Sequence, residues 1–341
     1  MVILSEDLYG KDIVMCTAVN YQTKDHYFGR TLDLEYSYRE EVVVTPRKFP
    51  LVFRTKGRMD SHYAIIGMAM VVNSYPLYYE AANEHGLAMA GLNFPGNAHY
   101  FDEMPGKDNI APFEFIPWIL GQCKDLAQAR ELLGSINLCN IHFSEEFPLS
   151  PLHWIIADRS GAITVESVAE GLKIYENPVG VLTNNPPFDY HMTHLREYLN
   201  LTHAEPENQF GGLELTPYSK GMGAIGLPGD LSSASRFVRA AFVKLNSLSG
   251  EGEQESVSQF FHILGAVDQQ RGCVRLPDGR CEITVYTSCI NTDKGIYYYT
   301  TYDNSCISAV DMHRCDLNGD RLFQYPLLQA QHIQWQNAEV F

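Results

Sequence analysis

One cysteine in this sequence stands near residues that could make it a nucleophile. Cys16 lies in Met15-Cys16-Thr17, and a predicted hairpin brings the chain back along Phe28-Gly29-Arg30-Thr31-Leu32-Asp33. A guanidinium close to a thiol favours the reactive thiolate, and a carboxylate can accept a charge-assisted hydrogen bond from an amine. Residues three apart on a regular strand point to opposite faces, so we expect the strand to end or bulge between Arg30 and Asp33. The alternative is an ordinary surface ion pair.

The other cysteines and the histidines are weaker candidates. The eight cysteines include no CxxC pair, and we expect them to be reduced and mostly buried. His191 and His194 are three apart on a predicted helix, which is a spacing that could suit a metal, and His85 is a further histidine. Because no third ligand stands in a recognisable motif, neither a metal nor another cofactor is predicted.

The first hundred residues are predicted to be mostly strands, separated by turn signals. We expect strands at residues 13–21, 26–33, 41–44, 63–72 and 87–93. After Pro112 the pattern changes, and apolar residues recur at helical spacing from Phe115 to Leu132, before Gly134. This predicts one amphipathic helix.

The second half of the chain alternates blocks of strands and helices. Strands are predicted at 153–158, 162–167, 172–175 and 180–183, with a hairpin turn at Arg159-Ser160-Gly161. Helices at 190–201, 234–245 and 256–266 precede strands at 282–290, 295–302 and 306–311. This block order favours an α+β fold with segregated layers. Residues 206–231 contain six glycines and either cover a site or cross the surface irregularly.

Composition excludes several classes of function. The formal net charge of −16 argues against a nucleic-acid partner, which needs a basic surface. The longest apolar stretches, such as residues 63–72, are too short for the roughly 20 residues of a membrane helix, so no membrane span is expected. Residues 1–14 contain Glu6, Asp7 and Asp12 and lack the features of a secretory signal. A cytoplasmic location is predicted.

Several short motifs along the chain together resemble those of the bile salt hydrolase (choloylglycine hydrolase) and penicillin V acylase family. The resemblance runs from Met15 to about Asp311. Besides Met15-Cys16-Thr17 and Phe28-Gly29-Arg30 with Asp33, the matching stretches are Asn83-Glu84-His85-Gly86-Leu87, Ala90-Gly91-Leu92-Asn93-Phe94-Pro95, Gly180-Val181-Leu182-Thr183-Asn184, Gly226-Leu227-Pro228-Gly229-Asp230 and Ser235-Arg236-Phe237. Each motif alone is weak, but their order and spread are specific.

The resemblance implies a four-layer αββα N-terminal-nucleophile (Ntn) hydrolase sandwich with two antiparallel sheets. In that family an initiator methionine is removed to leave an N-terminal cysteine, whose α-amine can accept the thiol proton. By resemblance, Cys16 is the nucleophile, Arg30 supplies a positive charge and Asp33 holds the α-amine. Asn184 and Asn93 are implied for the oxyanion hole. Arg236 matches an arginine close to the nucleophile, although Arg236 and Arg239 could instead be a solvent-facing helix surface.

Fourteen residues precede Met15, which departs from the family pattern. They are a misread start, an addition, or a leader removed by self-cleavage. We expect residues 1–15 to be such an extension and residues 16–341 to form one domain. With an amide nitrogen at Cys16, the unprocessed chain should be inactive, because an amide is not a base.

The implied activity is hydrolysis of the amide in glycine- or taurine-conjugated bile salts through a thioester, in a homotetramer. The alternatives are penicillin V or another acyl amide, such as an acyl-homoserine lactone, and a non-catalytic binding protein on the same scaffold. Asn93 favours bile salts, because an aromatic residue there is commoner among penicillin acylases. An apolar pocket is expected, for which four residues could be walls or core: Leu32, Leu34, Phe94 and Tyr100.

Overall fold

The computed structural model describes residues 15–337, and its centre is a pair of facing antiparallel sheets. The first sheet has the order β14 (Val181–Leu182), β1 (Met15–Gln22), β2 (His26–Leu34), β16 (Cys281–Asn291), β17 (Ile296–Thr301) and β18 (Asn304–Asp311), with β15 (Val274–Arg275) paired to β16. The second has the order β13 (Gly171–Glu176), β12 (Gly161–Val168), β11 (Leu152–Asp158), β8 (Ala88–Asn93), β7 (Tyr75–Asn83), β6 (Ile65–Val72), β3 (Glu41–Thr45) and β19 (Phe323–Pro326).

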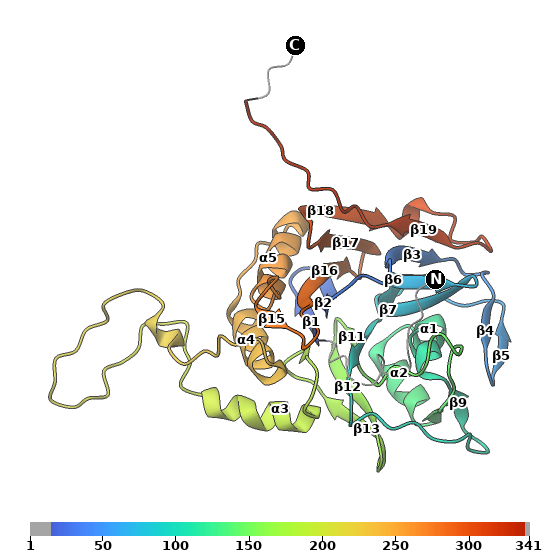
Figure 1. The fold of residues 1–341 in the computed structure, drawn as a ribbon, viewed down its shortest axis with the longest axis horizontal. Coiled ribbons are helices and arrows are strands. Elements are labelled where there is room, and N and C mark those ends of the chain that lie inside the picture. The colour runs from blue at the N-terminus through green and yellow to red at the C-terminus, as the bar shows by residue number, and fades with distance from the viewer. Residues whose placement is uncertain (1–14, 338–341) are drawn as a thin grey trace.

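Helices cover the outer faces of both sheets (Figure 1). The longer helices α4 (Ser233–Asn246) and α5 (Glu253–Gly265) pack on the first sheet, and α3 (Phe188–His194) lies against α4. On the second sheet lie α1 (Phe115–Gln122) and α2 (Leu126–Leu133). The layer order is therefore αββα, as predicted. Two small ribbons, β4 (Leu51–Phe53) with β5 (Gly57–Met59) and β9 (Asp108–Ile110) with β10 (Ile136–Leu138), flank this sandwich.

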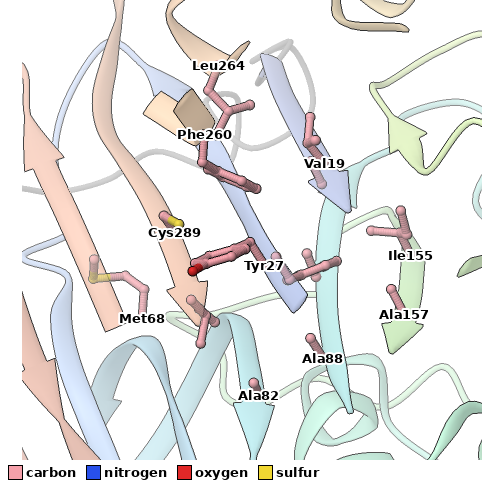
Figure 2. Close-up of a cluster of buried hydrophobic side chains, with 14 of the residues drawn as sticks. Val19, Tyr27, Met68, Ala82, Ala88, Ile155, Ala157, Phe260, Leu264 and Cys289 are labelled. Carbon is pink, nitrogen blue, oxygen red and sulfur yellow. The ribbon is translucent and has the colours of Figure 1, made fainter. Parts of the chain in front are cut away.

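The main core lies between the two sheets and continues under α5. Figure 2 shows Tyr27 from β2, Met68 from β6 and Ala88 from β8 in this cluster, together with Phe260 of α5. A second core lies between the second sheet and the helices α1 and α2. In it the rings of Phe115 and Trp154 meet edge to face, with their centres 4.9 Å apart. Because both faces of each sheet are covered, β2 and β8 are buried along their full length.

Most predicted strands are confirmed, and so is the Arg159-Ser160-Gly161 hairpin, in which Asp158 pairs with Gly161. The first two residues of the strand predicted at 13–21 lie outside the described residues. The single helix predicted from Phe115 is wrong: α1 ends before Cys123, which is extended, and Asp125 caps α2 by accepting from the Gln128 amide. Both helices pack on one sheet, so apolar spacing continues across the break and conceals it.

The glycine-rich segment 206–231 is mostly exposed and contains one short 3-10 helix, η3 (Met222–Ala224). In Figure 1 the segment between α3 and α4 extends away from the sandwich. None of these residues lines the cavity at Cys16, which favours the surface-crossing alternative. Among the described residues, no helix has the length and apolar content needed to span a bilayer.

Candidate active site

Cys16 is the second residue of β1 and its side chain faces the interior between the sheets. It lies directly opposite Leu32 of β2, so the two side chains share a face. Its exposed fraction is 1%, and its thiol lines a cavity of about 440 Å³. Arg30, two residues before Leu32 on β2, has the same orientation, and its Nη2 donates to Cys16 Sγ. The hairpin register therefore brings the predicted thiol and guanidinium together.

Arg30 is held where two strands of the opposite sheet separate. In the ladder between β7 and β8, Ala82 pairs with Ala88 and Glu80 pairs with Ala90. The pairing stops there, so Tyr79 and Gly91, which would form the next pair, are not paired. Arg30 Nη1 instead donates to both of these carbonyls, at 3.4 Å for Tyr79 and 2.5 Å for Gly91. Its guanidinium thus takes the place of the missing ladder bonds, which fixes it against Sγ.

The β6–β7 register also shifts at Tyr79: Met68 pairs with Glu80 and Ala69 with Tyr78, so Tyr79 is a bulge residue. The bulge and the separation of the strands open the second sheet next to Cys16. The cavity extends through this region, since Tyr79, Gly91 and Asn93 line it.

A buried carboxylate lies behind Arg30. Glu80 Oε2 is 3.9 Å from Arg30 Nε, and the exposed fractions of the two side chains are 0% and 1%. Burial raises the pKa of Glu80, while Arg30 and hydrogen bonds from the Tyr286 and Tyr297 hydroxyls lower it. Burial alone would lower the pKa of Arg30, but the groups around it, first Cys16, raise it above its ordinary value. The guanidinium is therefore charged.

Burial and the nearby positive charges have opposite effects on the pKa of the Cys16 thiol. Burial raises the pKa of Cys16, and the charge of Asp33 adds to this rise. Arg30 is the strongest opposing influence, followed by the Asp33 backbone and Arg236. In the chain with Met15 still attached, the thiol pKa is raised overall, so thiolate formation depends on positive charge close by.

Asp33 lies on the other face of β2, towards the helices. It pairs with Met15 in register and accepts hydrogen bonds from Thr31 Oγ1 at 3.0 Å and Thr284 Oγ1 at 2.6 Å. Burial raises its pKa to about 6. The predicted bulge in β2 is wrong: β2 pairs regularly with β1 throughout, and the irregularity is in β16, at Thr284 to Tyr286. Arg30 and Asp33 therefore flank the start of β1 from opposite faces.

Asn184 and Arg236 surround the backbone of Cys16. Asn184 Oδ1 accepts from the Cys16 amide at 2.8 Å and from Arg236 Nη2 at 2.8 Å, while Asn184 Nδ2 donates to the Asn93 carbonyl at 2.9 Å. Arg236 Nη1 donates to the Cys16 carbonyl at 2.6 Å and to Thr17 Oγ1 at 2.7 Å. Arg236 is fully buried in the first turn of α4, so the solvent-facing alternative is wrong for it.

The structure thus brings together all six residues predicted for the site. They belong to β1, β2, β8, the segment after β14 and α4: Cys16, Arg30, Asp33, Asn93, Asn184 and Arg236. Of the four pocket candidates, Leu32 and Leu34 line the cavity, whereas Phe94 stacks on His153 at 4.3 Å in the core. Tyr100 does not line it either, and its hydroxyl donates to the Ser150 carbonyl.

The cavity wall is mainly aromatic and aliphatic. Phe113 and Phe143 meet edge to face at 5.1 Å, and Arg54 lies 5.5 Å and 5.6 Å from their ring centres. Arg54 also donates to the Phe143 carbonyl at 2.6 Å, which fastens this part of the wall. Phe113 belongs to the short 3-10 helix η1 (Pro112–Glu114), Arg54 to a turn and Phe143 to a bend, and none of these segments is long enough to give a periodic signal in the sequence.

Sequence reasoning missed two buried carboxylates at the site, those of Glu80 and Glu282. Glu80 neutralises Arg30, and Glu282 Oε1 accepts from the Met15 amide at 3.0 Å. Burial raises the pKa of Glu282 to about 8, and nearby Asp33 adds to this. A carboxylate at a buried strand position is the one sequence signal that could have indicated either residue.

The histidines do not form a metal site in the described residues, where no group of three potential ligands occurs. His191 Nε2 lies 2.9 Å from the Asn184 carbonyl oxygen, and His194 Nδ1 lies 3.2 Å from Glu197. His85 meets the Tyr63 ring at 4.3 Å. All eight cysteines are free thiols, as expected, but the expected burial is wrong for four of them: Cys273 is exposed, and Cys281, Cys306 and Cys315 are half-buried.

Comparisons with known proteins agree with this geometry. Residues 16–325 match the family model of linear amide C–N hydrolases, choloylglycine hydrolase family. A bile salt hydrolase/transferase of Lactiplantibacillus plantarum is 56% identical over 92% of this chain and 97% of its own length. A protein of the same name from Clostridium perfringens is 39% identical over 91% of this chain and 96% of its own.

Solved structures support the fold assignment. A variant of the conjugated bile acid hydrolase from Clostridium perfringens superposes with a TM-score of 0.88 at 38% identity, covering 94% of this chain and all of that one. A penicillin V acylase from Agrobacterium tumefaciens shares the fold, with a TM-score of 0.69 at 18% identity over 91% of this chain and 90% of its own. The predicted Ntn hydrolase sandwich is confirmed. This chain belongs to the choloylglycine hydrolase family of linear amide C–N hydrolases.

Proposed function

We propose that this protein hydrolyses the amide bond of glycine- or taurine-conjugated bile salts, with Cys16 as an N-terminal nucleophile. The observation that carries this proposal is the Cys16 thiol, bound by Arg30 at the wall of an apolar cavity of about 440 Å³. The names of the relatives at 56% and 39% identity support the substrate class.

The proposed reaction requires removal of residues 1–15. The free α-amine then accepts the thiol proton, directly or through water, near neutral pH. Arg30 stabilises the thiolate, which attacks the amide carbonyl to form a tetrahedral intermediate. Asn184 Nδ2, which uses one hydrogen for the Asn93 carbonyl, can offer its second hydrogen to the developing oxyanion. Asn93 is proposed to contribute to the same hole.

Collapse of the intermediate breaks the C–N bond, and the α-ammonium protonates the leaving amine. The acyl group remains on Cys16 as a thioester. Water, deprotonated by the α-amine, then attacks the thioester and releases the bile acid. No cofactor takes part in these steps. Asp33 and Arg236 are proposed to hold the start of β1, because they flank the Cys16 backbone on the side of the helices.

Met15 and its peptide bond mark the step that precedes catalysis. The family match begins at Cys16, which supports cleavage before this residue. With Met15 attached, the Cys16 nitrogen is an amide that donates to Asn184 Oδ1, and it has no basic lone pair to offer the thiol. We therefore propose that the unprocessed chain is inactive, whether residues 1–15 are a leader, an addition or a misread start.

The apolar cavity suits a steroid acyl group. Burial of apolar surface gives roughly 25 cal/mol per Å² before ordering costs, so a broad steroid face gains more than a phenoxyacetyl group. Leu32 and Leu34 present apolar side chains within the cavity that contains Cys16. We therefore expect kcat/KM for conjugated bile salts to exceed that for penicillin V by at least about tenfold, and Asn93→Tyr to narrow this gap.

The test combines intact mass, N-terminal sequencing and hydrolysis assays on the same preparation. A chain starting at Met15 should lose the methionine and cleave glycocholate or taurocholate. A chain in which residues 1–15 cannot be removed should be inactive. Faster cleavage of penicillin V would transfer the assignment to penicillin V acylase and leave the Cys16 chemistry intact. A leader retained in the native protein, without hydrolysis, would instead support the binding-protein alternative. The homotetramer and the cytoplasmic location stay predictions.

A further inference from the structure

Two buried histidines bind the backbone of the segment that ends at Asn184. His191 Nε2 lies 2.9 Å from the Asn184 carbonyl oxygen, and His153 Nε2 lies 2.9 Å from the Thr183 carbonyl oxygen. Neither histidine is exposed to solvent. Because a carbonyl oxygen can only accept, each Nε2 must carry a proton and donate it. Two successive carbonyls are thus held by imidazole N–H groups.

The His191 ring is fixed in orientation and protonation. It belongs to α3 and stacks on Phe237 of α4 at 4.8 Å with an interplanar angle of 19°. Burial lowers the pKa of His191 to about 4, so the ring is neutral near pH 7 and its single proton is on Nε2. Among the described residues, Nδ1 has no hydrogen-bond partner. The ring therefore makes one directional hydrogen bond, to Asn184.

His153 is fixed by a second set of contacts. It stacks on Phe94 at 4.3 Å with an interplanar angle of 6°, and its Nδ1 is 3.1 Å from Glu166 Oε1. Glu166 Oε1 also accepts from the Phe188 amide at 2.9 Å, at the start of α3. Glu166 thereby connects His153 to the helix that carries His191.

We propose that His191 and His153 are positioning residues that set the direction of the Asn184 side-chain amide. The proposal deepens the proposed function, because it rests on Asn184 as an oxyanion donor. The other polar groups of Asn184 have separate partners: its amide donates to Ser233 Oγ at 2.9 Å, and its side chain bonds Cys16, Arg236 and Asn93. The carbonyl depends on His191, so loss of this bond frees the peptide plane to rotate.

The test compares His191→Phe with His191→Gln. Phenylalanine keeps a ring against Phe237 but has no donor, whereas glutamine returns an N–H group. A displacement of about 1 Å at a catalytic group can cost 100-fold in rate. We expect His191→Phe to lower kcat for amide hydrolysis by about 10- to 100-fold with KM within about twofold, and His191→Gln to recover part of this loss.

A second readout separates positioning from general damage. Alkylation of Cys16 by iodoacetamide needs the thiolate but no oxyanion donor, so its rate should stay unchanged in His191→Phe. The matched control is His194→Phe, on the same helix, whose ring stacks on Tyr190 and makes no bond to Asn184. This control should keep wild-type kcat and alkylation rate.

Unchanged kcat in His191→Phe, or equal losses of hydrolysis and alkylation, would overturn the proposal. If that variant does not fold, His153→Phe, which likewise lacks a donor, provides the same comparison through the Thr183 carbonyl, and parallel losses of hydrolysis and alkylation there would also contradict the proposal. Each variant is assayed on the amide that the wild type cleaves fastest. Failure of the proposed function is detected beforehand, as a processed wild type that cleaves no amide or as activity that survives Cys16→Ala.

Discussion

Replacement of Arg30 by methionine tests how the charge of Arg30 affects the thiol of Cys16, the proposed nucleophile. Arg30 Nη2 donates to Cys16 Sγ, and its charge is the strongest influence that lowers the thiol pKa. Two unit charges about 4 Å apart interact by about 4 kcal/mol at an effective dielectric constant near 20. Since about 1.4 kcal/mol corresponds to one pH unit, Arg30→Met should raise the thiol pKa by about 3 pH units.

The assay is the rate of iodoacetamide alkylation of the processed protein between pH 5 and pH 10, with peptide mapping to identify Cys16. The midpoint of the rate profile reports the thiol pKa, and it should move upwards in Arg30→Met. Hydrolysis at pH 7 should fall with the thiolate fraction, by about 100-fold or more. In Arg30→Lys the midpoint should lie between those of the wild type and Arg30→Met. An ammonium keeps the charge but cannot donate to the Gly91 carbonyl, the Tyr79 carbonyl and the sulfur at once, as the planar guanidinium does.

Substitution of Glu80 provides the control that separates the effect of Arg30 on the thiol pKa from its effect on stability. Arg30→Met leaves the Glu80 carboxylate buried without its cation, and breaking a buried ion pair costs about 3–5 kcal/mol of stability. The double variant Arg30→Met/Glu80→Gln removes both charges and should regain stability while the midpoint stays high. Glu80→Gln alone should move the midpoint downwards, because it removes a negative charge that competes for Arg30. An Arg30→Met midpoint within about 0.5 pH unit of the wild type would refute the reasoning.

Two further predictions address the nucleophile and the unprocessed chain. Cys16→Ala should reduce hydrolysis to below a few per cent while the melting temperature stays within a few degrees, and greater residual turnover would exclude Cys16 as nucleophile. In the protein that retains residues 1–15, burial raises the pKa of Asp33 to about 6 and that of Glu282 to about 8. The folded state then binds more protons than the unfolded state above about pH 4, so stability should fall as pH rises from 4 to 8. Glu282→Gln should flatten the melting-temperature profile between pH 6 and 8, and an unchanged slope there would contradict the role of Glu282.

Local sequence patterns predicted the elements that repeat a simple period. The strand from His26 and the two long helices near residues 234–245 and 256–266 carry such periods and are confirmed within a few residues. Strand β7 was not predicted: Pro76 interrupts its pattern, and Glu80 occupies a buried position that usually holds an apolar residue. Here tertiary contacts override the pattern, because Arg30 and two tyrosine hydroxyls make burial of Glu80 tolerable.

The site shows a similar division between motif and support. The six predicted residues came from motifs that resemble a known family, and the hairpin alone explained why Cys16 meets Arg30. Glu80 and His153 lie 50 and 31 positions from Arg30 and Asn184 in the sequence. Neither belongs to the quoted motifs, and a single sequence contains no signal that pairs a buried carboxylate with one particular arginine. Such supporting residues can be identified only from the structure, because they lie on one sheet and contact residues in or next to the other.

The mechanism we propose also explains why the nucleophile lies at the first positions of a strand. A thiol that uses its own α-amine as base must be N-terminal, yet a free chain end loses conformational entropy when it is held in place. The backbone around Cys16 is held at three points, which offsets this entropy cost. Asn184 accepts from the Cys16 amide, Arg236 donates to the Cys16 carbonyl, and Thr31 Oγ1 accepts from the Thr17 amide. The Asn184 bond uses the nitrogen that cleavage would convert into an amine. In the mechanism we propose, the backbone contacts of Cys16 are therefore already formed before residues 1–15 are removed, and this removal changes the chemistry of the Cys16 nitrogen more than it changes the fold.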